Sequence, residues 1–294
     1  MSTRRSFLKQ VSVLTPAALL APGAIFAEKK NKTVGLQLYT LRDLVAKDAR
    51  SVIQQVAAAG YKEVELYGFG GGKFFGTITP SELYSFMNGL GLSVPSGHYM
   101  PGQYLWGKDE SAGQAELDEN IQAALTMKSQ YLTIPYLPEE ARPDLDGYKR
   151  IAEKLNKAGE ICKKAGLQLA YHNHAFEFER HGDQTGYDVM PNSTDKDLVK
   201  WELDLYWTVY AGLDPVQLFE SLKGRIPMWH VKDMNKSNRS QNTEIGNGSI
   251  DWKRIFKAAK TSGLKHFFVE QENNYVPDPI SSVKKSIQYI QGNL

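Results

Sequence analysis

The sequence predicts a single-domain α/β fold, a (β/α)8 TIM barrel that occupies residues 28–294. Eight short runs rich in β-branched and aromatic residues alternate with longer amphipathic segments. The repeated order of strand, helix and glycine is typical of parallel strands joined by helical crossovers. Eight such units, without a glycine-rich phosphate loop after the first strand, favour a closed barrel over an open sheet. The expected strands are 34–40, 63–67, 93–99, 131–136, 167–174, 200–207, 227–233 and 266–272.

Capping residues mark where the helices between these strands begin and end. Thr79 and Glu82 form a capping box with Pro80 at the first helical position, and Asp214 and Asp278 each precede a proline in the same way. Glycine closes helices because it adopts the left-handed conformation without strain. The expected closing glycines are Gly60, Gly91, Gly166, Gly224 and Gly263.

Residues 1–27 have the pattern of an export signal. Arg4 and Arg5 form a twin-arginine pair, and a mostly apolar run follows that is short and broken by prolines. Such a run is a poor transmembrane helix, so we expect cleavage near Ala27, a periplasmic barrel and no integral membrane segment. The alternative is a frayed N-terminal helix of a cytoplasmic protein.

Charge and cysteine content exclude several classes of function. The chain has 35 Lys and Arg against 33 Asp and Glu, so it lacks the basic excess that binds a phosphate backbone, and we expect no nucleic-acid partner. Cys162 is the only cysteine, which excludes a disulfide framework and a cysteine-rich zinc site. It lies in an apolar pattern and is expected in the core.

Polar residues mark the carboxyl ends of the last four expected strands, where a barrel opens onto its site. They are His172 and His174, Glu202 and Asp204, His230 and Lys232, and Glu270 and Glu272. Burying ionised carboxylates costs several kcal/mol each unless something compensates them, and a divalent cation does so directly. Imidazole and carboxylate ligands without thiols suit one manganese, zinc, cobalt or magnesium ion, with manganese slightly favoured.

Several segments resemble the xylose-isomerase-like barrel superfamily, which includes sugar phosphate isomerases and epimerases, inosose dehydratases and AP-endonuclease-like proteins. The resemblance covers about residues 33–290, and its most specific part is the pair 230–233 and 246–252. The matching segments are 35–39 (GLQLY), 60–66 (GYKEVEL), 171–174 (YHNH), 202–204 (ELD), 230–233 (HVKD), 246–252 (GNGSIDW) and 269–272 (VEQE).

The resemblance implies one metal ion held by strands five to eight. By segment match, three of its ligands are Asp204, His230 and Glu270. Strand five departs from the family pattern, because His172 stands where a glutamate is common. Either His172 or His174 has become the ligand, or Glu177 folds back to supply a carboxylate. We predict Glu177, because additional carboxylates balance a divalent charge better, and this leaves the histidines for proton transfer.

The resemblance also implies chemistry that begins by removing a proton next to a carbonyl. We expect isomerisation or epimerisation of a sugar or keto-sugar through an enediolate. No arginine-rich phosphate clamp is evident, so the expected substrate is unphosphorylated. The candidate catalytic residues are His172, His174, Lys232 and Glu270. The candidate substrate-binding residues are Tyr39, Glu65, His98 and Trp207.

Other functions stay open. Loss of a β-substituent after the same proton removal would make a lyase or dehydratase for 3-keto-glycosides or inososes. A non-catalytic periplasmic sugar-binding protein would keep the barrel without chemistry. An AP-endonuclease-like nuclease would need more metal ligands and a basic DNA face. The sequence also leaves open whether the protein forms a homo-oligomer.

Overall fold

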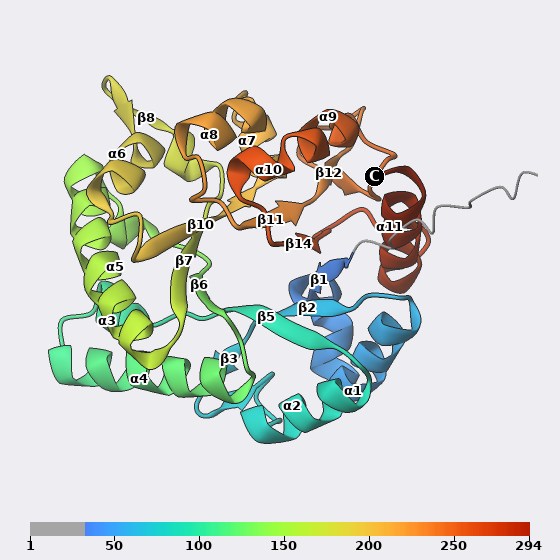
Figure 1. The fold of residues 1–294 in the computed structure, drawn as a ribbon, viewed down its shortest axis with the longest axis horizontal. Coiled ribbons are helices and arrows are strands. Elements are labelled where there is room, and N and C mark those ends of the chain that lie inside the picture. Colours follow the sequence, from blue (N-terminus) through green and yellow to red (C-terminus); the bar gives the residue numbers. More distant parts are fainter. Residues whose placement is uncertain (1–32) are drawn as a thin grey trace, which may run out of the picture. The chain divides into compact units, whose positions relative to one another are not determined.

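A computed structural model describes residues 33–294, so the expected export signal at residues 1–27 lies outside the described residues. Eight parallel strands close into a barrel with helices around it (Figure 1), which confirms the predicted fold. Each barrel strand lies within or next to one of the runs expected from sequence. The barrel strands are β1 (Gly35–Gln37), β2 (Glu63–Leu66), β5 (Ser93–His98), β6 (Tyr131–Ile134), β7 (Gln168–His172), β10 (Val199–Asp204), β11 (Met228–Val231) and β14 (His266–Val269).

The helices follow the capping residues read from the sequence. The Thr79–Glu82 capping box starts α2, Asp214 caps α8 and Asp278 caps α11. Gly166 ends α5 at a φ of 88°. The helices are α1 (Arg42–Ala58), α2 (Pro80–Gly89), α3 (Gly102–Leu105), α4 (Glu110–Thr126), α5 (Leu145–Ala165), α6 (Gly186–Ser193), α7 (Leu205–Tyr210), α8 (Pro215–Ser221), α9 (Trp252–Lys257), α10 (Ala259–Ser262) and α11 (Pro279–Asn293).

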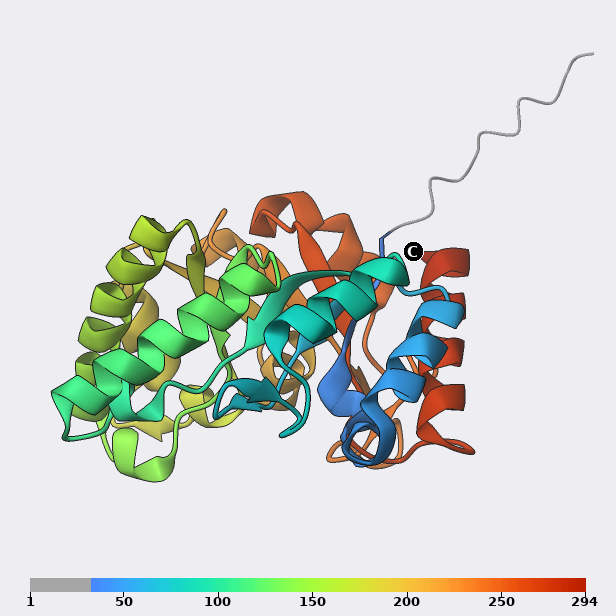
Figure 2. The ribbon, with the colours of Figure 1, turned by 90° about the horizontal axis from the view of Figure 1, so that it is seen from below.

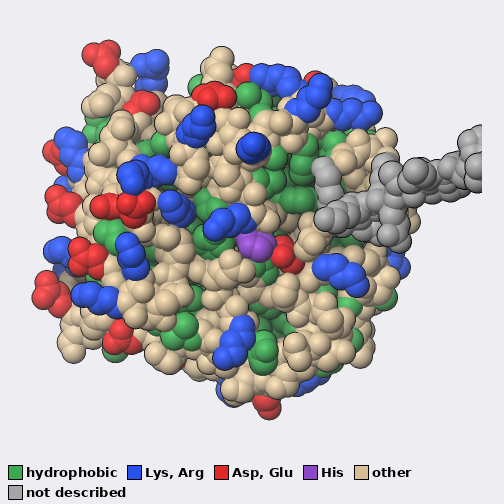
Figure 3. Space-filling model, viewed as in Figure 1, with side chains coloured by type: hydrophobic (Ala, Val, Ile, Leu, Met, Phe, Trp, Pro, Cys, Tyr) green, Lys and Arg blue, Asp and Glu red, His purple; other side chains and the backbone are tan. Residues whose placement is uncertain are grey.

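The first and last units meet where the barrel closes. Figure 2 shows α1 in blue beside α11 in red, and β1 pairs with β14 in parallel register. The hydroxyl of Tyr61 donates a hydrogen bond to the Val283 carbonyl at 2.8 Å, which ties the α1–β2 connection to α11. None of the helices in residues 33–294 is long and apolar enough to cross a membrane. Acidic and basic side chains are interspersed on the face seen in Figure 3.

All eight expected strands end earlier than predicted, and two of them are followed at once by a helical segment. The 3-10 helix η1 (Leu38–Leu41) follows β1, and α7 follows β10 because the Asp204 carboxylate accepts a hydrogen bond from the Trp207 amide and caps that helix. Trp207 therefore lies on a helix. The loops add elements that the sequence did not predict: the hairpins β3 (Phe69–Gly70) with β4 (Lys73–Phe74), β8 (Arg180–His181) with β9 (Gln184–Thr185) and β12 (Asp233–Met234) with β13 (Asn242–Thr243), and the 3-10 turns η2 (Glu139–Ala141) and η3 (Phe176–Phe178).

The barrel interior changes from apolar to polar along the strands. A small buried apolar cluster fills its amino end: Tyr131, Ala170, Met228 and Phe268. Gly35 leaves room for this cluster, because a Cβ there would lie 2.5 Å from Cδ1 of Phe268. Side chains two residues apart on a strand share a face, so the next inward layer is polar. Its members on the same strands are Thr133, His172, His230 and Glu270, all buried.

Candidate functional site

A cavity of about 450 Å³ opens beside this polar layer. Its rim is aromatic: the ring of Tyr39 lies edge-on to that of Tyr67 at 5.2 Å, and the ring of Tyr136 lies edge-on to that of His174 at 5.6 Å. Among the described residues, those that line the cavity include no arginine and no lysine. They are Tyr39, Tyr67, Gly68, Phe69, His98, Met100, Pro135, Tyr136, His172, His174, Glu270 and Glu272.

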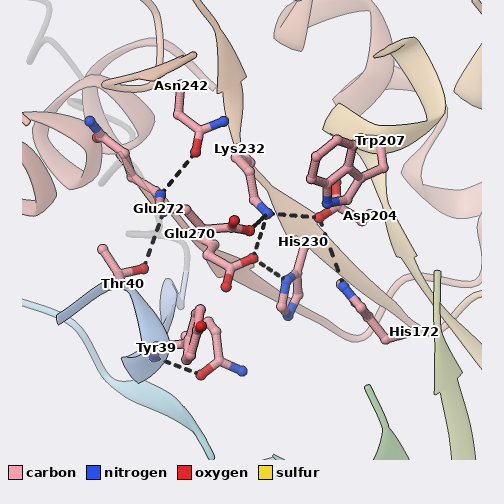
Figure 4. A network of polar contacts seen from close by, with 12 residues as sticks. Tyr39, Thr40, His172, Asp204, Trp207, His230, Lys232, Asn242, Glu270 and Glu272 are labelled. Carbon is pink, nitrogen blue, oxygen red and sulfur yellow. Dashed lines mark hydrogen bonds and ion pairs between the residues drawn. The ribbon is translucent and has the colours of Figure 1, made fainter. Parts of the chain in front are cut away.

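Three of the predicted metal ligands come together at this end of the barrel. One ligand atom from each of Asp204, His230 and Glu270 lies within 4.8 Å of the others, and all three residues are buried. The strands β10 and β11 pair directly, which brings Asp204 opposite His230. His230 Nδ1 lies 2.9 Å from Glu270 Oε2 (Figure 4). The predicted ligands Asp204, His230 and Glu270 thus form one compact group.

Lys232 places a buried ammonium against this group. Its Nζ lies 3.1 Å from Asp204 Oδ2 and 2.8 Å from Glu270 Oε2, and it also contacts the Glu272 carboxylate (Figure 4). Burial alone would lower the pKa of Lys232, but the three carboxylates outweigh burial and raise that pKa well above its usual value. Lys232 therefore stays protonated and compensates the negative charge around it.

The loops that follow the strands hold the carboxylates in place. The Asp204 amide donates to Asn173 Oδ1 at 3.1 Å. The Glu272 amide donates to Asn242 Oδ1 at 2.9 Å, and the Gln271 amide donates to Thr40 Oγ1 at 3.1 Å. Figure 4 shows Asn242 and Thr40 on either side of Glu272. Side chains from three different segments therefore anchor the backbone at Asp204 and at Gln271 and Glu272, the residues that follow Glu270.

A second polar group lies next to the first, deeper in the barrel. His98 Nε2 lies 2.8 Å from Glu202 Oε2 and 3.2 Å from Glu65 Oε2. Glu65 also contacts His230 Nε2 at 2.6 Å and accepts hydrogen bonds from Ser96 and Gln37 at 2.5 and 2.8 Å. Burial alone would lower the pKa of His98, but Glu65 and Glu202 raise it to about 9.

Of the four predicted substrate-binding residues, two line the cavity and two do not. His98 and Tyr39 line the cavity, as expected for residues that contact substrate. Glu65 is fully buried in the deeper group and does not line the cavity. Trp207 packs against His174, with ring centroids 5.9 Å apart, and is not on the cavity wall either.

The two histidines of strand five lie on the cavity wall with different surroundings. His172 Nε2 is 3.9 Å from Asp204 Oδ2, and its Nδ1 is 3.3 Å from Glu202 Oε2. The His174 ring stacks on Phe176 at 5.5 Å, and its buried Nδ1 has no hydrogen-bond partner. Burial lowers the pKa of His172 well below its usual value and that of His174 to about 3, so both rings are neutral.

Glu177 does not join the group of metal ligands, so the structure does not support the prediction that it is the fourth ligand. The turn η3 directs its carboxylate onto Tyr171, which alternates with His172 and points out of the barrel. Tyr171 Oη donates to Glu177 Oε1 at 2.6 Å, and the His174 amide donates to Glu177 Oε2 at 2.8 Å. Burial raises the pKa of Glu177 to about 7.

Sequence reasoning assigned no role to Glu202 or Asp233. Glu202 precedes Asp204 by two residues and shares its face, a signal that alternation along the strand already contained. Asp233 accepts hydrogen bonds from the amides of Gly246 and Gly248 at 2.8 and 3.1 Å. A Cβ on Gly248 would lie 2.1 Å from Asp233 Oδ1. The motif at 230–233 and 246–252 therefore includes a clamp that holds the β12–β13 hairpin, which carries Asn242.

Comparisons with known proteins agree with this architecture. The sequence model of a family described as xylose isomerase-like TIM barrel matches residues 53–292. The structure of a sugar phosphate isomerase/epimerase from Parabacteroides distasonis superposes with a TM-score of 0.79 at 28% identity, over 93% of this chain and 98% of that one. The protein IOLI, solved with a bound zinc atom, has a similar fold, with a TM-score of 0.68 at 13% identity over 88% of this chain and 98% of that one.

A curated relative adds a second comparison. An inosose dehydratase from Clostridium perfringens is 26% identical over 162 residues, which is 49% of this chain and 54% of that protein. The chain thus matches about half the length of this relative. The family match, which extends over most of the chain, shows that the protein belongs to the xylose isomerase-like TIM barrel family.

Proposed function

We propose that the protein is a metal-dependent sugar isomerase or epimerase that removes a proton next to the carbonyl of an unphosphorylated sugar. One observation carries this proposal: Asp204, His230 and Glu270 converge within 4.8 Å, and Glu270 lies on the wall of a cavity large enough for a sugar. Buried histidine and carboxylate groups at the carboxyl end of a barrel are typical of an active site.

The residues present fit a divalent cation. Two carboxylates and one imidazole are a donor set that Mn²⁺, Zn²⁺, Co²⁺ and Mg²⁺ accept, and manganese suits the oxygen-rich set slightly better. Asp204, His230 and Glu270 would hold the ion. Such an ion polarises a carbonyl and stabilises the enediolate that forms when the neighbouring proton leaves.

His174 is the proposed proton acceptor. Its ring lines the cavity, is neutral, and has a buried Nδ1 without a hydrogen-bond partner. Negative charge developing on the substrate would strengthen it as a base. Trp207 and Phe176 pack against this ring and fix its orientation. Lys232, which stays protonated, pairs with Asp204, Glu270 and Glu272 and lowers the net negative charge beside the cavity, which would favour a negatively charged intermediate.

The lining of the cavity supports a substrate without phosphate. Among the described residues, no arginine or lysine lines it, whereas Glu270 and Glu272 do, and carboxylates repel a phosphate group. Tyr39 and Tyr136 offer aromatic faces that pack against the apolar face of a sugar ring. The twin-arginine pattern at residues 1–27 favours the periplasm as the location, outside the pool of phosphorylated sugars.

Dehydration is the second candidate, favoured by the likeness to inosose dehydratases. Both reactions start with the same proton removal. In isomerisation or epimerisation the proton returns to carbon, whereas in dehydration the β-hydroxyl leaves with a proton as water. The difference lies in the substrate that the cavity accepts.

The experiment that tests the proposal measures exchange of the substrate hydrogen next to the carbonyl with deuterium from the solvent. The protein, stripped of metal and reloaded with Mn²⁺, is incubated in D₂O with free ketoses, inososes, 3-keto-glycosides and phosphorylated sugars, and NMR detects deuterium next to the carbonyl. We expect deuterium in an unphosphorylated substrate, together with an isomer, an epimer or an elimination product. Exchange restricted to phosphorylated sugars would contradict the proposal.

A variant of Asp204 tests whether the reaction depends on the group of Asp204, His230 and Glu270. Asp204→Asn should lose turnover and the ion held by Asp204, His230 and Glu270, because it removes a charged ligand of that group. His181→Gln, on the β8–β9 hairpin, is the matched control and should retain both. If Asp204→Asn kept its ion content and its turnover, the assignment of Asp204, His230 and Glu270 as the metal site of the reaction would be wrong.

A further inference from the structure

The deeper polar group has its own set of potential metal ligands. One ligand atom from each of His98, His172, Glu202 and His230 lies within 4.8 Å of the others. Three of these residues come from β7, β10 and β11, which pair directly as neighbours, and the curvature of the barrel brings His98 of β5 against them. The proposed reaction requires one ion, at Asp204, His230 and Glu270, and it leaves this second set without a role.

Two atoms of the deeper group are buried without a hydrogen-bond partner: Nδ1 of His172 and Oε1 of Glu202. The side chains of these residues are 3% and 0% exposed. Buried polar atoms nearly always have a partner, and these two unpaired atoms on neighbouring side chains are available to a ligand. His172 Nδ1 lies 3.3 Å from Glu202 Oε2 but does not form a hydrogen bond with it. His98 Nε2 approaches that oxygen from the other side at 2.8 Å.

We propose that His98, His172 and Glu202 hold a second divalent cation, deeper in the barrel than the first. His230 lies between the two groups, with Nδ1 toward Glu270 and Nε2 3.3 Å from Glu202 Oε2. The second site goes beyond the proposed function, because the proton-transfer chemistry does not require it. Its ion would orient His172 at the cavity wall.

The donor atoms predict which ion each group prefers. The deeper group offers imidazole nitrogens and a carboxylate, a set that suits zinc or cobalt. The group of Asp204, His230 and Glu270 is richer in oxygen and suits manganese better. A divalent cation would also balance the two buried carboxylates of the deeper group, Glu202 and the neighbouring Glu65. His98 lies on the cavity wall and gives the ion a route of entry.

Cobalt titration of the metal-free full chain tests the second site. Co²⁺ bound by nitrogen ligands absorbs visible light, and elemental analysis after gel filtration counts the ions. We expect two equivalents for the wild-type protein and one for His98→Gln, His172→Gln or Glu202→Gln. Asp204→Asn should also bind one equivalent, with the nitrogen-type spectrum retained, and the control His181→Gln should bind two.

The outcomes separate the second site from the proposed function. One equivalent in the wild-type protein, lost in Asp204→Asn and kept in Glu202→Gln, would overturn the second site and leave the proposed function intact. Turnover by an Asp204→Asn protein with unchanged ion content would overturn the role of Asp204, His230 and Glu270 in the proposed function, whatever the deeper group binds. If circular dichroism shows that the variants of the deeper group do not fold, the wild-type count and the spectrum of Asp204→Asn decide.

Discussion

Replacing Lys232 with methionine removes a buried positive charge and keeps most of the side-chain volume. Lys232 is 1% exposed, and its ammonium contacts the carboxylates of Asp204, Glu270 and Glu272. Removing one partner of a buried ion pair leaves an uncompensated charge and costs about 3–5 kcal/mol. In a domain of this size, 1 kcal/mol lowers the melting temperature by about 2–4 °C. The metal-free variant should therefore melt about 6–20 °C below the wild-type protein.

The assay is thermal and urea unfolding in the presence of a chelator, followed by circular dichroism. Lys196→Met is the matched control, because Lys196 pairs with Asp197 at an exposed position and should be replaceable with almost no change in melting temperature. Divalent cation should restore part of the stability of the Lys232 variant, since it compensates the same carboxylates. A loss below about 1 kcal/mol in metal-free protein would refute the view that Lys232 compensates this group.

Three further predictions concern the clamp, the buried acid and the proposed base. Gly248→Ala places a methyl group 2.1 Å from Asp233 Oδ1 and should lower the free energy of unfolding by about 1–3 kcal/mol. The control Gly89→Ala has open space around the new methyl group and should not lower it. Equal melting temperatures for the two variants would contradict the role of Asp233 as a clamp. Glu177 has a pKa of about 7 in the folded protein, raised by burial above the ordinary value of 4.5, so its contribution to stability is present below pH 4.5 and lost as the pH rises through 7. The stability of the wild-type protein relative to Glu177→Gln should fall by up to about 3 kcal/mol over that range in urea unfolding, and a difference that does not vary with pH would argue against this role. His174→Gln should lower turnover by about 10²–10⁴-fold with unchanged ion content, which elemental analysis checks; loss of the ion would make His174 a ligand instead.

The sequence by itself determined the barrel and the strands that carry its polar ends. Period-two alternation and capping residues are local signals, so the strand 227–233 and the Thr79–Glu82 cap needed no tertiary information. The same alternation placed Asp204, His230 and Glu270 on inward faces at the carboxyl ends of neighbouring strands. Their convergence then follows from closure of the barrel.

Only the tertiary structure decided where side chains go once a strand has ended. Glu177 follows strand five by a few residues, and the turn η3 directs its carboxylate to Tyr171 outside the barrel rather than to the group of Asp204, His230 and Glu270. The contacts of Glu65 with His98 and His230 join strands that are far apart in the chain. Such contacts depend on strand tilt and on loop conformation, and neither is encoded in the periodicity of a single segment.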